Sequence, residues 1–228
     1  PYYEYEGRVT FDYDLPPAGS ALFCVSPKKP DRFPPPDHEE TVIEQLEPVG
    51  PLAVNRDRPN VLTLDFCDIS VGGEQRESTY FHKAQQLVFQ KHGFQQNLWE
   101  RSVQFKDNII SREKFGPDTG FEANFHFFLR GFGGDKPDMS IVVEQPDLYT
   151  ISVNGESVEW DAERWWLDRC FGVLDIEEAV TNGENILTLK ARPFSIFHEL
   201  ESVYLLGDFA LEPVERGFVV VPARGLDL

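Results

Sequence analysis

The second half of the chain alternates apolar and polar residues between turns, and this pattern most restricts the folds available to it. Between Phe121 and Arg130, apolar residues at odd positions alternate with Glu122, Asn124 and His126. A repeat of two residues is typical of a β-strand with one buried face. Further strands are expected at 139–144, 149–153, 157–160, 185–190, 203–211 and 217–221. Strands every 8–12 residues or so, joined by turns such as Asn154-Gly155, predict an all-β sandwich or jelly roll.

The N-terminal part has a different composition. Residues 7–14 alternate as a half-buried strand would, and residues 21–26 are expected to return beside them. Residues 27–59 then contain eight prolines, which indicates a long surface excursion or linker. We therefore expect residues 1–59 to form a short β-hairpin and a proline-rich segment, the end of an upstream domain. Residues 60–228 form the β-sandwich in this interpretation.

Two further elements are expected at the start of the sandwich. Residues 60–71 show a strand pattern that ends at Gly72-Gly73. Residues 81–92 place Phe81, Ala84 and Leu87 on one face, which predicts a helix, with Gly93 at the position after its end. A strand over 85–90 is the alternative.

Charge and length restrict the partners. The chain has 39 acidic and 21 basic residues and a net charge of −18, which argues against nucleic acid and makes an anionic polysaccharide a poorer ligand than a neutral one. No apolar run approaches the ~20 residues of a membrane-spanning helix. The three cysteines, Cys24, Cys67 and Cys170, permit at most one internal disulfide, and buried free thiols are the favoured interpretation. The chain opens with Pro1 and has a single methionine, Met139, so we expect a processed protein or a piece of a longer one.

Motifs with a fixed spacing give no catalytic centre. The sequence has no nucleophile elbow, phosphate-binding loop or H-E-x-x-H motif, and its five histidines form no i, i+4 pair that would indicate zinc. No cofactor is expected. The acidic residues Asp65, Asp68 and Glu74 leave a structural calcium ion open, although a solvated rim is the favoured alternative.

Paired carboxylates are the remaining catalytic route. Glu199 and Glu201 would lie on one face of a strand, with His198 on the other, and glycoside hydrolysis uses two such acids. Pairs of this spacing arise by chance in so acidic a chain, so this hydrolase hypothesis ranks last.

Aromatic residues indicate a binding function instead. The segment 160–169 (WDAERWWLDR) places three tryptophans among charged residues. A sugar packs its C–H face on such a ring, while its hydroxyls pair with charged side chains. Candidate ligand-binding residues are therefore Trp165, Trp166, Asp168 and Arg169, with one ring stacking, Arg169 as donor and Asp168 as acceptor. The alternative is that both rings are core or interface residues.

Several stretches resemble the galactose-binding-like jelly-roll domain that accompanies catalytic domains in glycoside hydrolase family 2 and in α-L-rhamnosidase-like bacterial proteins. The resemblance covers about residues 60–228 and lies in 149–155 (YTISVNG), 171–176 (FGVLDI), 182–189 (NGENILTL) and 203–209 (VYLLGDF).

In that family, the catalytic acids lie in a separate barrel domain. The resemblance thus implies a non-catalytic accessory module of a larger glycoside hydrolase-like protein, in the periplasm or outside the cell, with a neutral oligosaccharide or polysaccharide and the parent's catalytic domain as partners. His198 and Glu199 are a second candidate patch, facing that catalytic domain. A purely structural interaction domain that braces the catalytic domain is the alternative.

Overall fold

The computed structural model describes residues 2–15, 19–23, 57–100, 115–133 and 138–223. The chain divides into two units, Pro1–Leu52 and Ala53–Leu228. In the first unit, β1 (Tyr2–Tyr5) pairs antiparallel with β2 (Arg8–Phe11). Glu6 and Gly7 connect the two strands with φ angles of 50° and 74°, which suit a tight hairpin turn.

The partner of β2 differs from the one predicted. Residues 21–23 are not in a strand, and residues 24–26, like residues 27–56 of the proline-rich segment and Cys24, lie outside the described residues. The segment just before β2 needs only a two-residue loop to reach it, so closing that loop costs less entropy than closing the longer one. Val9 and Phe11 are exposed, so the half-buried face predicted for this strand is not found within the unit. Phe11 does contact Phe23, at a ring-centroid distance of 4.8 Å.

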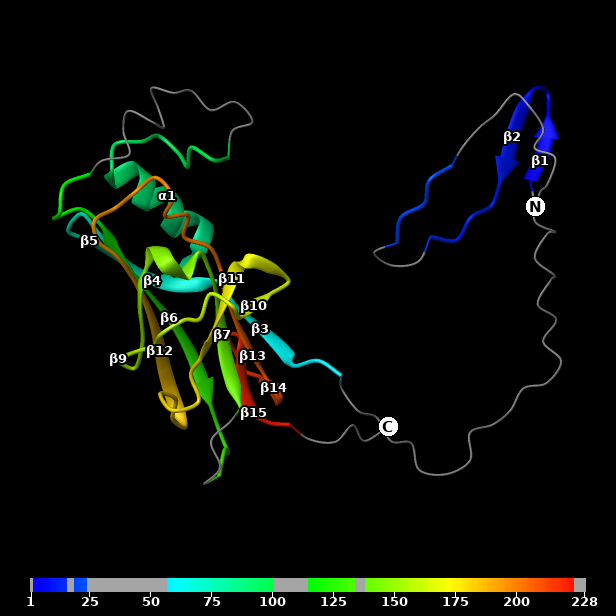
Figure 1. Ribbon diagram of the computed structural model, residues 1–228. Coiled ribbons are helices and arrows are strands. Elements are labelled where there is room, and N and C mark those ends of the chain that lie inside the picture. Colours follow the sequence, from blue (N-terminus) through cyan, green and yellow to red (C-terminus); the bar gives the residue numbers. More distant parts are fainter. Residues whose placement is uncertain (1, 16–18, 24–56, 101–114, 134–137, 224–228) are drawn as a thin grey trace. The chain divides into compact units, whose positions relative to one another are not determined.

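The second unit is an all-β sandwich, as predicted (Figure 1). Its first sheet has five antiparallel strands in the order β10-β11-β7-β13-β3. Their bounds are β3 (Asn60–Leu64), β7 (Met139–Glu144), β10 (Trp165–Trp166), β11 (Asp168–Asp175) and β13 (Val203–Gly207).

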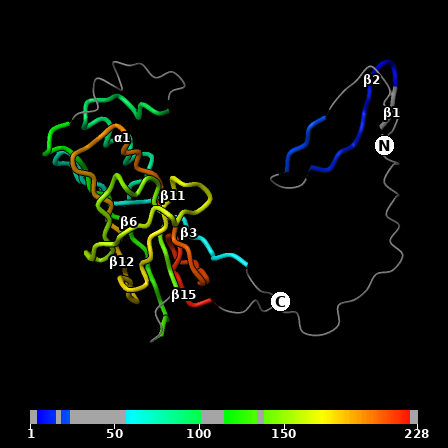
Figure 2. Tube along the Cα trace, in the orientation of Figure 1, coloured from blue at the N-terminus to red at the C-terminus, as the bar shows by residue number. Residues whose placement is uncertain are grey.

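The second sheet has eight strands in the order β14-β15-β6-β12-β8-β9, with β4 also pairing to β6 and β5 pairing to β4. The pairing of β15 with β6 is parallel, and the others are antiparallel. The bounds are β4 (Phe66–Val71), β5 (Glu74–Tyr80), β6 (Phe121–Leu129), β8 (Thr150–Val153), β9 (Glu156–Ser157), β12 (Gly183–Ala191), β14 (Phe209–Pro213) and β15 (Phe218–Pro222). The long strands β6 and β12 run side by side through the sheet (Figure 2).

Two predicted strands are each divided between the sheets. Residues 60–71 break at Asp65 into β3 and β4, and residues 203–211 break at Asp208 into β13 and β14. Strands that change sheet in this way form the corners of a sandwich. Close backbone contact at the second corner requires glycine, since a Cβ on Gly207 would lie 2.7 Å from the carbonyl oxygen of Asp138.

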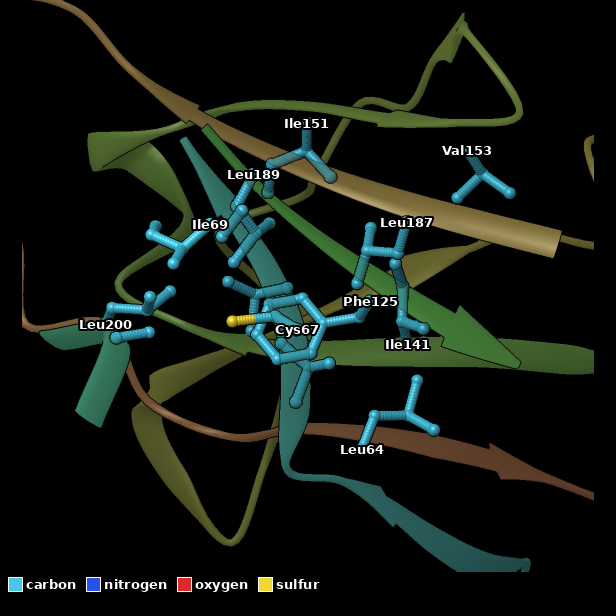
Figure 3. Packing of buried hydrophobic residues seen from close by; sticks show 14 of the residues in the cluster. Leu64, Cys67, Ile69, Phe125, Ile141, Ile151, Val153, Leu187, Leu189 and Leu200 are labelled. Atoms are coloured by element: carbon cyan, nitrogen blue, oxygen red, sulfur yellow. The ribbon is translucent and has the colours of Figure 1, made fainter. Parts of the chain in front are cut away.

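The core lies between the inner faces of the two sheets. The alternation of β6 points Phe121, Ala123, Phe125, Phe127 and Leu129 inward, and all five are buried. Figure 3 shows the ring of Phe125 beside the thiol of Cys67. Cys67 is buried and free, and burial raises the pKa of its thiol to about 12. Cys170 is also free but only half-buried.

The predicted helix is confirmed as α1 (Phe81–Lys91), which packs its buried residues Ala84, Leu87, Val88 and Phe89 against the end of the sandwich (Figure 1). His92 is its C-cap, and Gly93 follows with a φ of 86°, as expected after a helix C-terminus. A single turn of 3-10 helix, η2 (Pro146–Leu148), precedes β8. In the part of the chain that the structure describes, no helix is long and apolar enough to cross a membrane.

Candidate ligand-binding surface

The tryptophan-rich segment forms an edge of the five-stranded sheet. Trp165 and Trp166 make up β10, where Trp165 pairs with Gly172 and Trp166 with Asp168 across an irregular register. The Trp166 ring is half-buried against Tyr204, at 5.3 Å between centroids, whereas Trp165 is 49% exposed. Trp166 therefore has a packing role, and Trp165 presents its ring to solvent.

Asp168 and Arg169 follow at the start of β11, and both are exposed. One carboxylate oxygen of Asp168 accepts a 3.0 Å hydrogen bond from the backbone N–H of Cys170, and this bond holds the pKa of Asp168 below its usual range. The structure thus keeps the four predicted residues within one corner, but among them only Trp165, Asp168 and Arg169 present exposed side chains.

Beside this corner lies a pocket of about 320 Å³ lined by Trp160 and Arg164. The indole of Trp160 is 36% exposed. Arg164 pairs with Asp175 on β11 through both terminal nitrogens, one of them 2.8 Å from Oδ1. Ser140 donates a further hydrogen bond of 2.9 Å to the same oxygen, so the Asp175 carboxylate is fixed from two sides.

Local backbone bonds hold the loop that carries Trp160. Asp161 accepts a bond from the N–H of Glu163 at 2.9 Å through its side chain and from the N–H of Arg164 at 3.0 Å through its carbonyl. The N–H of Val173 in turn donates to the carbonyl of Arg164 at 3.1 Å. On the other side of the pocket, the Asn154-Gly155 turn, with φ angles of 52° and 83°, places β9 at the rim. The pocket is therefore built on anchored backbone.

A larger groove of about 940 Å³ lies on the outer face of the eight-stranded sheet, over β4, β5, β6 and the end of β12. Its floor carries polar side chains that point away from the core, including Asp68, Ser70, Glu122 and Asn124. Lys190 lies 3.4 Å from the Glu122 carboxylate, so part of this floor is charge-paired.

The wall of the groove is the β4–β5 hairpin. The pairing of β4 with β5 shifts register between Cys67 and Ile69, and Ser78 adopts a φ of 45°. The N–H of Ser78 donates to a carboxylate oxygen of Asp68 at 2.7 Å. A bulge of this kind bends and twists the strand pair. Gln75, Arg76 and Glu77 of β5 line the groove.

His126, next to the groove, joins two strands. Its Nε2 lies 3.0 Å from Asp68 and its Nδ1 lies 2.9 Å from Glu184, so both ring nitrogens face carboxylate oxygens. The other oxygen of Asp68 is used by Ser78. These contacts fix the side chain of Asp68 at the groove floor.

The second predicted patch lies largely inside the fold. His198 is 4% exposed, its Nε2 donates to the carbonyl of Leu148 at 2.8 Å, and its Nδ1 accepts from the N–H of Ser195 at 2.9 Å. Burial lowers the pKa of His198, which favours the neutral form of the ring. The expectation of an accessible His198 is corrected: it bridges the loop after β12 to η2.

Glu199 and Glu201 are not in a strand, contrary to the geometry that the hydrolase hypothesis assumed. A side-chain amide holds each carboxylate: Asn97 donates to Glu199 at 2.7 Å and Gln85 to Glu201 at 2.9 Å. Burial, with a contribution from Glu144, raises the pKa of Glu201. The void beside the pair is too small for a water molecule, so a sugar cannot enter between them.

Within the described ranges, no group of three or more potential metal ligands comes together. Asp68 is bonded to Ser78 and His126, and Glu74 is paired with Lys91 and Arg76. Of the three acidic residues considered as calcium ligands, Asp68 and Glu74 are thus bonded to other groups of the protein.

No protein-family model matches this chain, and no curated protein or solved structure matches it. The ligand therefore has to be inferred from the chemistry of the pocket and the groove.

The segment 160–169 that sequence reasoning singled out lies beside the pocket, but the pocket itself was not predicted. Trp160, Arg164 and Asp175 come together only because Arg164 reaches a strand eleven residues later in the chain. The spacing of Trp160 and Arg164 around a turn was the one available signal. The groove has no signal in the sequence, since it depends on which strands are neighbours.

Proposed function

We propose that this chain is a non-catalytic, carbohydrate-binding accessory module of a larger glycoside hydrolase-like protein. The observation that carries the proposal is the pocket in which the exposed Trp160 ring lies beside the Arg164–Asp175 pair. Its volume of about 320 Å³ is at the lower end of the roughly 300–1,000 Å³ of small-ligand sites. That size suits one or two sugar rings.

The side chains of the pocket supply both parts of sugar recognition. The face of an indole packs against the C–H groups of a pyranose ring. A guanidinium has five N–H donors, and Arg164 uses two terminal nitrogens on Asp175, which leaves donors for sugar hydroxyls. The carboxylates of Glu159 and Asp161 add acceptors at the rim.

The charge around the pocket favours a neutral glycan. Besides Arg164, the charged lining residues are all acidic: Glu156, Glu159, Asp161, Asp175 and Glu178. The whole chain has a net charge of −18. An anionic polysaccharide would be repelled by both, whereas uncharged hydroxyls pair well with carboxylate acceptors.

The proposal of a binding role without catalysis is supported by the side-chain amides that hold Glu199 and Glu201 and by the narrow void beside them. The resemblance to glycoside hydrolase accessory domains points the same way and favours a periplasmic or extracellular location. Hydrolysis by this pair is the weakest alternative, because the void beside the two half-buried carboxylates has no room for a sugar between them.

A screen of the chain on an array of plant, host and microbial glycans tests the proposal, followed by calorimetry on any hit. We expect a neutral sugar to bind and Trp160→Ala to reduce its affinity at least tenfold, or about 1.4 kcal/mol. The control is Phe218→Ala, which removes a 49% exposed ring on β15 and should leave affinity unchanged. Both variants should melt within a few degrees of the parent protein. No binding to any glycan on the array, or an equal loss of affinity in both variants, would contradict the proposal.

A structural brace for the catalytic domain is the second candidate. Trp165 is 49% exposed and Leu167 is 71% exposed at the same corner of the sheet. Adjacent exposed apolar side chains are typical of a surface that meets another protein domain. Protection of this corner from hydrogen exchange in the full-length parent, without any glycan binding, would support this alternative.

A further inference from the structure

The outer face of the eight-stranded sheet carries a continuous row of small polar side chains. Register pairs Asp68 on β4 with Asn124 on β6, and Asn124 with Thr188 on β12. Thr188 pairs with Ser152 on β8, and Ser152 with Ser157 on β9. Residues directly opposite in neighbouring strands lie on the same face of a sheet. The row therefore crosses five strands at one level.

The two ends of this row lie at the two cavities already described. Asp68 and Asn124 line the groove, and Ser157 lines the Trp160 pocket. With neighbouring strands about 4.8 Å apart, the four intervals give a path of roughly 19 Å. A single pyranose ring is much shorter than that, so one ligand must be a chain to touch both ends.

The chemistry of the row suits an uncharged polyhydroxylated chain. The Thr188 hydroxyl donates to Asn124 at 2.7 Å, which fixes the middle of the row. Neither Ser152 nor Ser157 has a side-chain hydrogen bond to any described part of the chain, so both hydroxyls are open to a ligand. Asp68 is the one charged member. Small side chains also keep the surface low enough for a chain to lie on it.

We propose that a linear neutral oligosaccharide lies across this row, with one end ring on Trp160 and the other end in the groove. The proposal rests on the function proposed for the Trp160 pocket and specifies the length and path of its ligand. Hydroxyls of the successive sugars hydrogen-bond to Ser157, Ser152 and Thr188. The groove, with Asn124 and Asp68, accepts the far end.

Calorimetry with neutral linear oligosaccharides of the cello-, xylo-, manno- and galacto-series, from disaccharide to hexasaccharide, tests this path. In the series that binds, we expect affinity to rise about tenfold or more from the disaccharide to the longer members, which corresponds to about 1.4 kcal/mol. Ser152→Tyr puts a ring in the middle of the row. It should remove this gain and leave the disaccharide affinity unchanged.

The matched control is Thr63→Tyr, at an exposed position on β3 of the other sheet, which should change neither affinity. Thr188→Tyr should repeat the effect of Ser152→Tyr, so that the result does not depend on one variant. The extended path is wrong if the disaccharide binds through Trp160 but affinity does not rise with ligand length. It is also wrong if Ser152→Tyr and Thr188→Tyr leave the gain in affinity with length unchanged. In both cases the proposed function of the Trp160 pocket is retained. If no oligosaccharide of any length binds, the pocket and the path both fail.

Discussion

Asn97, in the loop after α1, hydrogen-bonds to Gln85 and Glu199, and its replacement tests this hydrogen-bond network. It is 2% exposed. Its Nδ2 donates to Glu199 at 2.7 Å and to Gln85 at 3.1 Å, and its Oδ1 accepts from the N–H of Trp99 at 2.9 Å. Asn97→Asp has nearly the same shape and keeps the bond to Trp99. It replaces the donor that faces Glu199 with a second carboxylate oxygen.

The expected loss follows from the two bonds removed. A bond to a charged group contributes about 1.5–3 kcal/mol and a neutral one about 0.5–1.5 kcal/mol, so Asn97→Asp should lower the free energy of unfolding by about 2–4.5 kcal/mol at pH 7. Repulsion from Glu199 adds to this loss and raises the pKa of the introduced carboxyl. Part of the loss should therefore be recovered at pH 5, where the pair of carboxyls can share a proton.

Urea unfolding at pH 7 and pH 5 measures both effects, with Asn97→Ala as the control. The alanine variant loses the same donor without adding a charge, so its loss relative to the parent protein should change less between the two pH values than the loss in Asn97→Asp. A loss below about 1 kcal/mol for Asn97→Asp at pH 7, or the same loss at both pH values, would refute the network described for Asn97.

Three further predictions concern titration and backbone geometry. Burial raises the pKa of Glu201 in the folded protein, so protonation favours folding, and this stabilisation is lost as pH rises through the folded pKa. Glu201→Gln should therefore increase stability at pH 7 relative to pH 4, by less than about 1 kcal/mol because the side chain is half-exposed. Thermal melts that show no such increase would contradict this prediction. Burial lowers the pKa of His198, so stability falls as pH drops below about 6.5, where the unfolded chain takes up the proton. An NMR titration of the ring should give a pKa below 6.5, and titration at about 6.5 would overturn the buried assignment. Gly120 has a φ of 138°, and a Cβ there would lie 2.0 Å from the carbonyl oxygen of Ala191. In chemical denaturation, Gly120→Ala should therefore lower the free energy of unfolding by more than about 1 kcal/mol, whereas Gly133→Ala, whose Cβ meets nothing within 4 Å, should lower it far less. Equal losses in the two variants would contradict the close approach at Gly120.

The local part of the fold follows from the sequence because its causes are local. Alternation over 121–129 gives β6 and its buried face, and Asn154-Gly155 gives the turn between β8 and β9. The helix over 81–91 follows from its apolar face and from Gly93. Each of these features depends on residues close together in the chain.

The parts that sequence reasoning missed depend on distant contacts. The patterns over 60–71 and 203–211 continue through Asp65 and Asp208, so neither pattern shows that the chain changes sheet there. His198 looks like a surface residue until Leu148 and Ser195 are found on either side of its ring.

The proposed binding surface also has a part that follows from local sequence and a part that depends on distant contacts. The segment 160–169 was recognised from its composition, but the pairing of Arg164 with Asp175 and the row from Asp68 to Ser157 needed the strand register. Sequence reasoning therefore predicted one segment of the proposed surface and not its extent.

The most direct test of the central claim, that the Trp160 pocket binds a neutral glycan, is two-dimensional NMR of the four indole N–H groups during titration with a sugar that scores on the array. Trp160→Phe and Trp165→Phe assign the two exposed indole signals. We predict that the Trp160 signal shifts in a saturable way. The signal of Trp99, whose indole N–H donates to the carbonyl of Ile196 at 2.7 Å, should stay in place. A shift confined to Trp165, or none at saturating sugar, would contradict the account.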